Sequence, residues 1–308
     1  MRSARIHRHG DPSVIRIDDL PRPVPGPGEL LVRVAATSFN PSEAALRAGW
    51  LRDVIATRLP YALGWDVAGT VEALGAGAGG RFSVGDRVVG RLDAGGAAAE
   101  YVAASAELFA AAPSSIPLEA AAALPVAGLT AWQAVVEHGR VAARERVLVN
   151  GAGGGVGGFV VQLAKRRGAH VIATASPRSA DAVRGQGADE LVDYTAVAVA
   201  DAVRGPVDVL LNLAPIDPAA AAALVALVRP GGRAVSIATP VETPRGAGVE
   251  TTHFVARNDR AQLAELVALV DAGALAVDWA ESLPLSELAE VHRRSEAGEL
   301  RGKVVLVP

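Results

Sequence analysis

Short apolar segments and turn residues alternate closely in the first hundred or so residues of the chain. Residues 29–40, ELLVRVAATSFN, predict one strand, and residues 65–92 predict two strands joined by a glycine-rich connection. Residues 96–104 predict another short strand, whereas SFNPSEAALRAGW (38–50) is interpreted as a loop. Short strands with turn residues at close spacing are typical of antiparallel sheets. This part of the chain therefore predicts a β-rich domain.

The pattern changes after about Pro117, where helical spacing and apolar strands begin to alternate. Residues 118–139 are rich in alanine and predict one helix that ends at Gly139. The strands then expected are 146–150, 170–176, 190–194, 206–214 and 233–238, and the helices are 156–167, 179–187, 220–232 and 259–273. Apolar strands separated by helices indicate βαβ units with a parallel sheet. Residues 302–308 predict a strand that returns to the first domain.

A run of glycines follows the strand 146–150 and opens the next helix. In a dinucleotide site the first βα turn must be tight, its backbone must approach two phosphates, and the helix must pack closely on the strand. Glycine meets these needs, and the helix N-terminus supplies amide donors. Two registers fit the pattern, Gly153-x-Gly155-x-x-Gly158 and Ala152-x-Gly154-x-x-Gly157. We favour the second because Val156 then packs inward; a purely structural glycine turn is the alternative.

This turn predicts a bound nucleotide diphosphate, and the next strand indicates which nucleotide. The predicted contacts are Ala152, Gly153, Gly154, Gly155, Val156 and Gly157. An acidic residue after the second strand would bind the ribose 2′-hydroxyl and repel a 2′-phosphate. Here the strand continues as ATASPRS, with no acid at Ala175 or Ser176, and both Ser176 and Arg178 can donate to phosphate. We therefore predict NADPH as the cofactor; the alternative for Arg178 is a solvated loop cation.

Composition narrows the class of protein further. The sequence has 308 residues, enough for two ordinary domains, half of them apolar, with a net charge of −3. It has no block of Lys and Arg that would indicate nucleic acid, and no cysteine for disulfides, thiolate catalysis or cysteine-ligated zinc. No window approaches the roughly 20 apolar residues of a membrane span, and the N-terminus lacks a signal-peptide core. We expect a cytoplasmic protein with neither membrane nor nucleic acid as partner.

Several segments form a specific combination along nearly the whole chain. They read PVPGPGELLVRVAATSFNPSEAALRAG, LGWDVAGTVEALG, FSVGDRVVG, AAALPVAGLTAW, VLVNGAGGGVGGFVVQLAK, GAHVIATAS, GADELVDY and GKVVLVP. In this combination the chain resembles the zinc-independent quinone oxidoreductase (zeta-crystallin-like) branch of the medium-chain dehydrogenase/reductase superfamily. The resemblance implies an α/β protein: a Rossmann domain with a doubly wound parallel sheet, plus a GroES-like β-barrel catalytic domain. The catalytic domain is expected at 1–118, completed by 256–308, and the NADPH-binding Rossmann domain at 119–255.

The resemblance also indicates whether the chain has the residues to bind zinc. Zinc-dependent relatives carry their metal through a cysteine near the FN segment and a histidine in the segment matching GWD. Those places hold Asn40 and Trp65 here, and neither supplies a thiolate or an imidazole. The six histidines are scattered and are interpreted as structural or surface residues. No metal site is therefore expected.

The resemblance implies the remaining site residues. The catalytic group is expected in SFNPSEAALRAGW, where the Asn40 amide can donate a hydrogen bond; a turn-forming Asn before Pro41 is the alternative. The family often has a Tyr or Lys where this chain has Ala45, so Tyr61 and Trp65 are substitute candidates, with ordinary packing as their alternative. The cofactor is expected to contact Thr130 (otherwise a helix cap), Tyr194, Leu213, Ala214, Ile237, Ala238 and Lys303 (otherwise a surface lysine). The loops 213–214 and 237–238 follow strand ends, where doubly wound sheets bind ligands.

The function implied is NADPH-dependent hydride transfer to a small hydrophobic quinone or α,β-unsaturated carbonyl, with an enoyl reductase of a biosynthetic pathway as a variant. The missing proton donor at Ala45 keeps a second hypothesis open. It is a catalytically weak, NADPH-binding sensor or interaction protein of the same fold. A homodimer is expected through the outer strand of the Rossmann sheet, in the segments 233–238 and 249–256.

Overall fold

The computed structural model describes residues 1–55, 57–242 and 246–308. Contacts divide the chain into unit 1, Met1–Val126 with Asn258–Pro308, and unit 2, Ala127–Arg257. The sequence placed these boundaries at 118/119 and 255/256. The helix at 118–121 packs on strands of unit 1, which accounts for the later first boundary. The assignment of a separate role to each unit stays a prediction.

Unit 1 is built mainly from antiparallel strands. Its strands are β1 (Arg2–Ile6), β2 (Ile15–Asp19), β3 (Glu29–Ser38), β4 (Tyr61–Ala62), β5 (Asp66–Leu74), β6 (Arg87–Arg91), β7 (Tyr101–Ser105), β8 (Phe109–Ala111), β15 (Trp279–Pro284) and β16 (Lys303–Val307). Its helices are α1 (Pro41–Ala48), α2 (Leu118–Ala121), α8 (Arg260–Asp271) and α9 (Leu288–Glu296), with 3-10 turns at Pro12–Val14, Ala106–Leu108 and Leu285–Glu287. The predicted strands between residues 29 and 104 are confirmed as β3, β5, β6 and β7.

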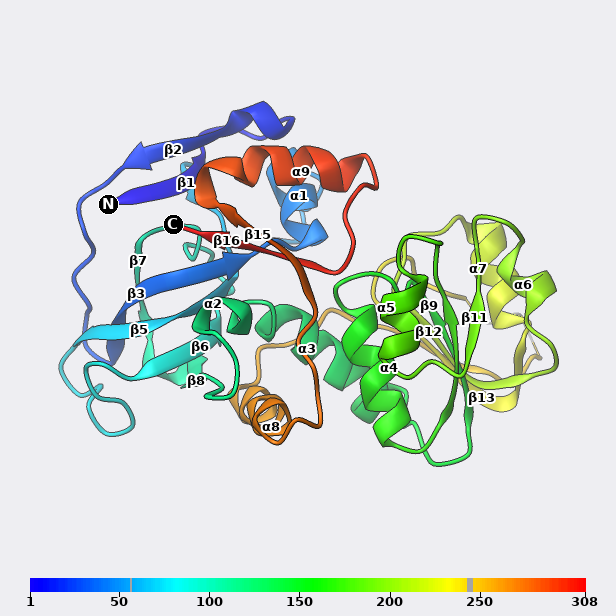
Figure 1. The fold of residues 1–308 in the computed structure, drawn as a ribbon. Coiled ribbons are helices and arrows are strands. Elements are labelled where there is room, and N and C mark those ends of the chain that lie inside the picture. Colours follow the sequence, from blue (N-terminus) through cyan, green and yellow to red (C-terminus); the bar gives the residue numbers. More distant parts are fainter. Residues whose placement is uncertain (56, 243–245) are drawn as a thin grey trace. The chain divides into compact units, whose positions relative to one another are not determined.

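The larger sheet of unit 1 joins the two ends of the sequence. Its strand order is β15-β16-β3-β5-β6-β8, and β7 also pairs with β3. Figure 1 shows β16, coloured red, lying beside the blue β3, where Val305 is opposite Ser38. The predicted return of residues 302–308 to the first domain is therefore confirmed. This pairing brings Lys303, at the start of β16, to the carboxyl end of β3.

The interpretation of residues 38–50 as a loop is wrong, because this segment contains the helix α1. Pro41 is the first helical residue, which suits proline since the N–H that it lacks has no partner inside the helix there. Gly49 ends the helix with a φ of 87° in the left-handed region, where glycine carries no steric penalty. Asn40 stands at the N-cap without capping through its side chain, which leaves the amide for other partners.

Unit 2 contains a parallel sheet between two layers of helices. Its strands are β9 (Arg146–Asn150), β10 (His170–Thr174), β11 (Glu190–Val192), β12 (Val207–Asn212), β13 (Val228–Ser236) and β14 (Glu250–His253). Its helices are α4 (Gly157–Arg166), α5 (Ala180–Gly185), α6 (Val199–Ala202) and α7 (Pro218–Val225). In the described residues the order β11-β10-β9-β12-β13-β14 is all parallel. This is the 3-2-1-4-5-6 order of the Rossmann fold, so the predicted doubly wound sheet is confirmed.

The two helix layers of unit 2 follow from this order. In Figure 1, α4 and α5 lie on one side of the sheet, and α6 and α7 lie on the other. Leu224 and Val225 of α7 are buried in one cluster with Leu148, Ile172 and Leu210 of the central strands. Removing such large apolar side chains from water is the main source of stability for an α/β unit.

Two predicted elements have different limits in the structure. The single helix at 118–139 is divided into α2, α3 (Pro125–Trp132) and a π-helix at Gln133–His138. Pro125 lacks an N–H and cannot continue the helix of the preceding residues, so a new helix begins there. The predicted helix 220–232 ends at Val225, and β13 begins at Val228 rather than at residue 233.

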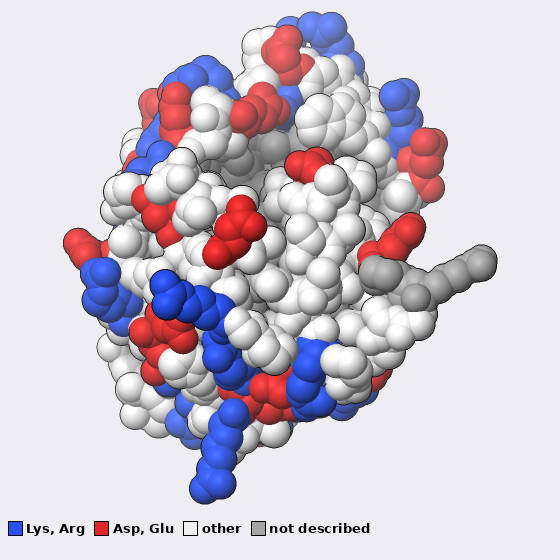
Figure 2. All heavy atoms as spheres, turned by 90° about the vertical axis from the view of Figure 1, so that its right-hand side faces the viewer, with Lys and Arg blue, Asp and Glu red and all other residues white. Residues whose placement is uncertain are grey.

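Charged side chains of both signs are interspersed on the surface. Figure 2 shows Lys and Arg beside Asp and Glu over a mostly uncharged face. Pairs such as Lys165–Asp189 (2.7 Å) and Arg229–Asp208 (2.5 Å) illustrate this mixing in unit 2. Among the described residues, no helix is long and apolar enough to cross a bilayer.

Candidate functional site

The carboxyl edge of the sheet in unit 2 has the topology of a ligand site. The chain proceeds from β9 to one side of the sheet and from β12 to the other, so the strand order reverses between these two neighbours. Open α/β sheets bind ligands at this switch point, outside the carboxyl ends of the strands. The glycine turn lies there, because it connects β9 to α4.

The geometry of the turn explains its glycines. Gly151 has a φ of 92°, which favours glycine. A Cβ on Gly157 would lie 2.3 Å from the carbonyl oxygen of Ala152, so only glycine lets the start of α4 approach this backbone. This contact supports the register Ala152-x-Gly154-x-x-Gly157. Val156, however, is partly exposed at the N-cap of α4, so the inward packing expected of it is made by Gly157 instead.

A row of buried polar side chains supports the turn from below, and the sequence analysis missed it. Thr174 Oγ1 accepts a hydrogen bond from the Gly151 N–H at 2.8 Å and donates to Asn150 Oδ1 at 3.2 Å. Asn150 Nδ2 in turn donates to Asn212 Oδ1 at 2.8 Å. Each of these residues ends its strand directly after three apolar residues, and that recurrence is the signal that could have revealed them.

The predicted loops after β12 and β13 lie at this same edge. The Leu213 N–H donates to the Asn150 carbonyl at 2.9 Å, and the Ile237 N–H donates to the Asn212 carbonyl at 3.1 Å. A Cβ on Gly151 would lie 3.1 Å from Ala214, so this loop lies directly against the glycine turn. Ala238, beside Ile237, is exposed. The structure therefore brings together Leu213, Ala214, Ile237 and the turn.

The residues predicted to bind the adenosine end of NADPH, including its 2′-phosphate, follow two neighbouring strands. Thr174 at the end of β10 is opposite Val192 at the end of β11. Ser176 and the exposed Arg178 follow β10, and Tyr194, which is 52% exposed, follows β11. Ser179 packs against the turn, because a Cβ on Gly153 would lie 2.4 Å from its Oγ. The segment 176–179 is thus adjacent to the glycine turn, and Gly154, Gly153 and Gly155 remain at least partly exposed.

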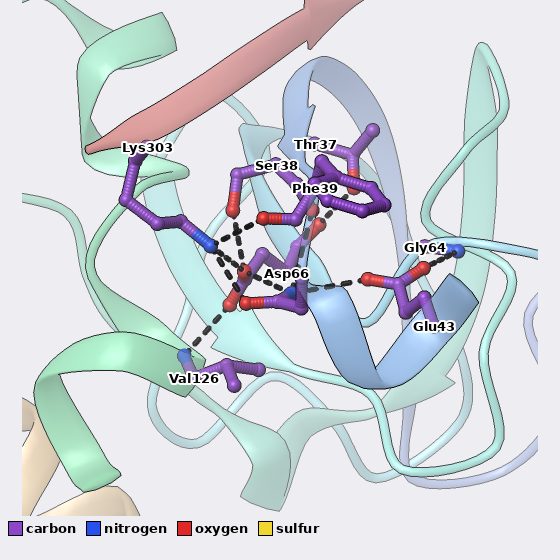
Figure 3. A network of polar contacts seen from close by, with 9 residues as sticks. Thr37, Ser38, Phe39, Glu43, Gly64, Asp66, Val126 and Lys303 are labelled. Atoms are coloured by element: carbon purple, nitrogen blue, oxygen red, sulfur yellow. Dashed lines mark hydrogen bonds and ion pairs between the residues drawn. The ribbon is translucent and has the colours of Figure 1, made fainter. Parts of the chain in front are cut away.

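Unit 1 contains a second polar cluster, drawn in Figure 3, that is centred on Asp66. Asp66 Oδ2 accepts from Ser38 Oγ at 2.5 Å and from Asn40 Nδ2 at 2.9 Å. Lys303 Nζ donates to the same oxygen at 3.2 Å. Asp66 Oδ1 accepts from the Val126 N–H at 2.7 Å. The cluster thus unites β3, the start of α1, β5, α3 and β16.

Every polar atom of Asn40 and Lys303 in this cluster is engaged. Asn40 Nδ2 also donates to Glu43 Oε1 at 3.0 Å, and Asn40 Oδ1 accepts from Lys303 Nζ at 2.7 Å. Lys303 donates its third hydrogen bond to the Phe39 carbonyl at 2.9 Å. A cofactor contact of Lys303, or a substrate contact of Asn40, would have to replace one of these bonds. Both contacts stay predictions, and the structure places Lys303 beside Asn40, one of the catalytic candidates.

Glu43 is the acidic residue of this cluster whose side chain is favoured in its uncharged, protonated form. Its carboxyl group is buried, and it accepts from Asn40 and, at Oε2, from the Gly64 N–H at 2.9 Å. Burial raises the pKa of Glu43 to about 7, helped by the nearby negative charge of Asp66 and opposed by these hydrogen bonds. The sequence analysis listed Glu43 only as a neighbour and missed Asp66 altogether. Asp66 follows Trp65 at the start of β5, and an acid beginning an apolar strand was the available signal.

Tyr61 and Trp65 form a pair in unit 1. The Trp65 Nε1–H donates to the Tyr61 hydroxyl at 3.0 Å, and each side chain is about nine-tenths buried. Burial raises the pKa of Tyr61 to about 12, so the phenol keeps its proton at neutral pH. Both rings also belong to an apolar cluster with Leu63 and Phe39. Packing and a proton-holding role are therefore both compatible with this pair.

Thr130 lies inside α3 and is buried, so it does not cap the start of that helix. In the part of the chain that the structure describes, no group of three or more His, Asp or Glu side chains is arranged to hold a metal ion. His292 is fully buried with its ring 4.8 Å from that of Phe39, and burial lowers its pKa to about 3. It is therefore neutral and structural.

Both units of the chain contain segments that match known protein families. Residues 26–114 match the family described as alcohol dehydrogenase GroES-like domain, and residues 186–306 match the one described as zinc-binding dehydrogenase. A solved mycobacterial quinone oxidoreductase is 31% identical, with full coverage of both chains and a TM-score of 0.83. The chain belongs to the quinone oxidoreductase family of the medium-chain dehydrogenase/reductase superfamily. The predicted combination of GroES-like and Rossmann folds is confirmed.

Two further comparisons are informative. A mycobacterial protein solved in complex with NADPH is 30% identical, with full coverage of both chains and a TM-score of 0.89. A chloroplastic quinone-oxidoreductase homologue from Spinacia oleracea is 41% identical over 179 residues, which are 56% of this chain. The match spans about half of that relative, 54% of its length.

The close contact at Gly157 predicts that Gly157→Ala destabilises this family member. The added Cβ meets the Ala152 backbone, and overpacking of this kind costs about 1–3 kcal/mol. Gly185→Ala is the matched control, because nothing lies within 4 Å of its Cβ and alanine favours a helix. Urea unfolding measures both changes. An unfolding free energy for Gly157→Ala equal to that of the wild type would refute the close approach.

Burial of Glu43 predicts a pH-dependent stability. Its pKa is raised from 4.5 to about 7 on folding, so the folded state binds more protons between these values and stability falls as the pH rises through them. Relative to Glu43→Gln, the wild type should lose roughly 3 kcal/mol of unfolding free energy between pH 4.5 and pH 7. Urea unfolding at pH 5 and pH 8 tests this, with Glu119→Gln at an exposed position of α2 as control. A difference that does not change with pH would contradict the prediction.

Proposed function

We propose that this protein is an NADPH-dependent oxidoreductase that transfers hydride to a small hydrophobic quinone or α,β-unsaturated carbonyl. The observation that carries the proposal is the glycine turn at the switch point of the β11-β10-β9-β12-β13-β14 sheet. This arrangement is typical of dinucleotide binding. The mycobacterial relative solved with NADPH and the quinone oxidoreductases among the relatives support the cofactor and the substrate class.

The residues of the turn fit a nucleotide diphosphate. Gly154 is exposed, and the contacts of Gly151, Gly153 and Gly157 show a backbone packed too closely on its inner side for side chains. The first turn of α4 follows directly, and such a turn offers amide groups without partners inside the helix and the positive end of the helix dipole. When bound, the nicotinamide ring supplies the hydride.

NADPH rather than NADH is favoured by the residues after β10. Ala175 and Ser176 stand where an acid would repel a 2′-phosphate, and Arg178 follows them. A guanidinium donates several hydrogen bonds in a planar fork and suits phosphate. We propose that Ser176 and Arg178 bind the 2′-phosphate and that Tyr194 lies near the adenosine.

The chain's own residues would donate a proton to the substrate and stabilise the negative charge that the donor then carries. We assign the proton to the Tyr61 hydroxyl, which is protonated at neutral pH because its pKa is about 12. As hydride reaches the β-carbon of an enone, charge develops on the carbonyl oxygen and its affinity for a proton rises. The Trp65 indole N–H then stabilises the charge left on Tyr61, since it already donates to that oxygen.

We further propose that zinc takes no part. Asn40 and Trp65 occupy the places where zinc-dependent relatives have their cysteine and histidine, and the Asn40 amide is bound to Glu43, Asp66 and Lys303. The alternative function, an NADPH-binding sensor with weak catalysis, is favoured by Ala45, where the family often has a Tyr or Lys. The homodimer and the cytoplasmic location stay predictions; β14 is the outer strand at which such a dimer would form.

The assay that tests the function follows NADPH absorbance with a panel of quinones and enones. We expect turnover with at least one acceptor, and slower turnover of enones by Tyr61→Phe. NADPH binding without turnover of any acceptor would favour the sensor. Absence of NADPH binding would reject the proposed function.

Cofactor preference is tested separately with Arg178→Ala. Loss of a charge-assisted contact with phosphate should raise the Kd for NADPH about tenfold and leave the Kd for NADH unchanged. Arg184→Ala is the matched control, because this exposed arginine of α5 pairs with Asp181 at 2.8 Å. Equal effects of Arg178→Ala on both nucleotides would reject recognition of the 2′-phosphate by Arg178.

A further inference from the structure

The two oxygens of the Asp66 carboxylate face two different parts of unit 1. Oδ2 accepts from Ser38, Asn40 and Lys303, at distances between 2.5 and 3.2 Å. Oδ1 accepts from the main-chain N–H of Val126, at 2.7 Å. Figure 3 shows Val126 on the opposite side of this carboxylate from Glu43. Asp66 is fully buried, so no water competes with these donors.

Val126 is a special position because it is the second residue of α3. The first amide groups of a helix have no partner within the helix, and Pro125 has no N–H at all. A negative carboxylate at this end also interacts favourably with the helix dipole. Asp66, which is 60 residues earlier in the chain, therefore acts as the cap of α3.

The helix α3 continues beyond this cap into the other unit. Val126 is the last residue of the first segment of unit 1, and Ala127 is the first residue of unit 2. Thr130, the predicted nicotinamide contact, lies on the same helix one turn further. The group that holds Asn40 and Lys303 in place is thus bonded to the start of the helix that carries Thr130.

We propose that Asp66 is a positioning residue that holds the Asn40–Lys303 cluster and the start of α3 in one arrangement. The rate effect predicted below depends on the proposed function, whereas the effect on α3 does not. A simpler reading is an ion pair with Lys303 that serves stability alone. The two readings differ in what happens at Oδ1.

Asp66→Asn separates these readings. An asparagine has one acceptor oxygen, so it can cap Val126 or face Lys303 and Asn40, and its NH₂ then opposes the remaining donors. Amide hydrogen exchange should become about tenfold faster in the first turn of α3, as after loss of a helix cap, and stay unchanged in α8. The kcat for quinone reduction should fall about tenfold, while the Kd for NADPH should change less than about threefold.

Thr37→Val is the matched control. Its hydroxyl donates to the main-chain carbonyl of Asp66 at 2.7 Å and leaves the carboxylate untouched. It should lower stability, as loss of a buried hydrogen bond does, without changing kcat or the exchange of α3 relative to α8. If Asp66→Asn behaves like Thr37→Val, the positioning role is refuted.

A second variant covers the case in which Asp66→Asn does not fold. Asp66→Leu combined with Lys303→Met removes both buried charges together, which proteins often tolerate. Leucine cannot cap Val126, so fast exchange in α3 is still expected, and wild-type exchange would overturn the proposal. If the wild type turned over no acceptor, the proposed function would fail while the exchange result still decided the positioning role.

Discussion

The pairing of Asp66 with Lys303 inside unit 1 is the interaction on which the candidate catalytic region depends. Both side chains are almost completely removed from water, at 0% and 3% exposure. Burial of an ion costs several kcal/mol and is tolerated only where hydrogen bonds replace the lost water. That requirement accounts for the surrounding residues: Ser38, Asn40 and Val126 donate to the carboxylate, while the ammonium group donates to Asn40 and Phe39. The arrangement of β3, α1 and β16 follows from it.

Unit 2 also buries polar side chains beside its candidate site, but these side chains are uncharged. Its apolar strands end in Thr174, Asn150 and Asn212, which are buried and bonded to one another and to the Gly151 N–H. A row of neutral polar groups fixes the turn without placing a charge next to an incoming phosphate. The turn itself has no side chain beyond a methyl group between residues 151 and 155, so its shape is set by what lies beneath it.

Sequence reasoning was most successful where one local pattern sufficed. The glycine run, the alternation of strands and helices and the apolar return strand 302–308 each predicted elements that the structure contains. The helix α1 was missed although Pro41 and Gly49 mark its ends, because the segment was interpreted through its expected chemistry instead of its caps. The length of the helix predicted at 118–139 was overestimated, because the alanine-rich composition was given more weight than Pro125, where a new helix begins.

The Asp66 cluster could not have been found in this way. Its members are 237 residues apart in the case of Asp66 and Lys303, and pairing across such a distance is decided by strand register rather than by local spacing. Lys303 was singled out from its segment GKVVLVP but given a different partner. A buried lysine needs an anion, and only the sheet order of unit 1 shows which one is in reach.

The insertion of unit 2 between two segments of unit 1 has a consequence for biosynthesis. The sheet of unit 2 is formed by strands between residues 146 and 253, so all of them are synthesised before β15 and β16 of unit 1. The carboxylate of Asp66 is synthesised early, but its cation, Lys303 of β16, follows only after unit 2. Until β16 is available, the carboxyl end of β3 lacks one strand partner, and unpaired strand edges of this kind favour aggregation of a nascent chain.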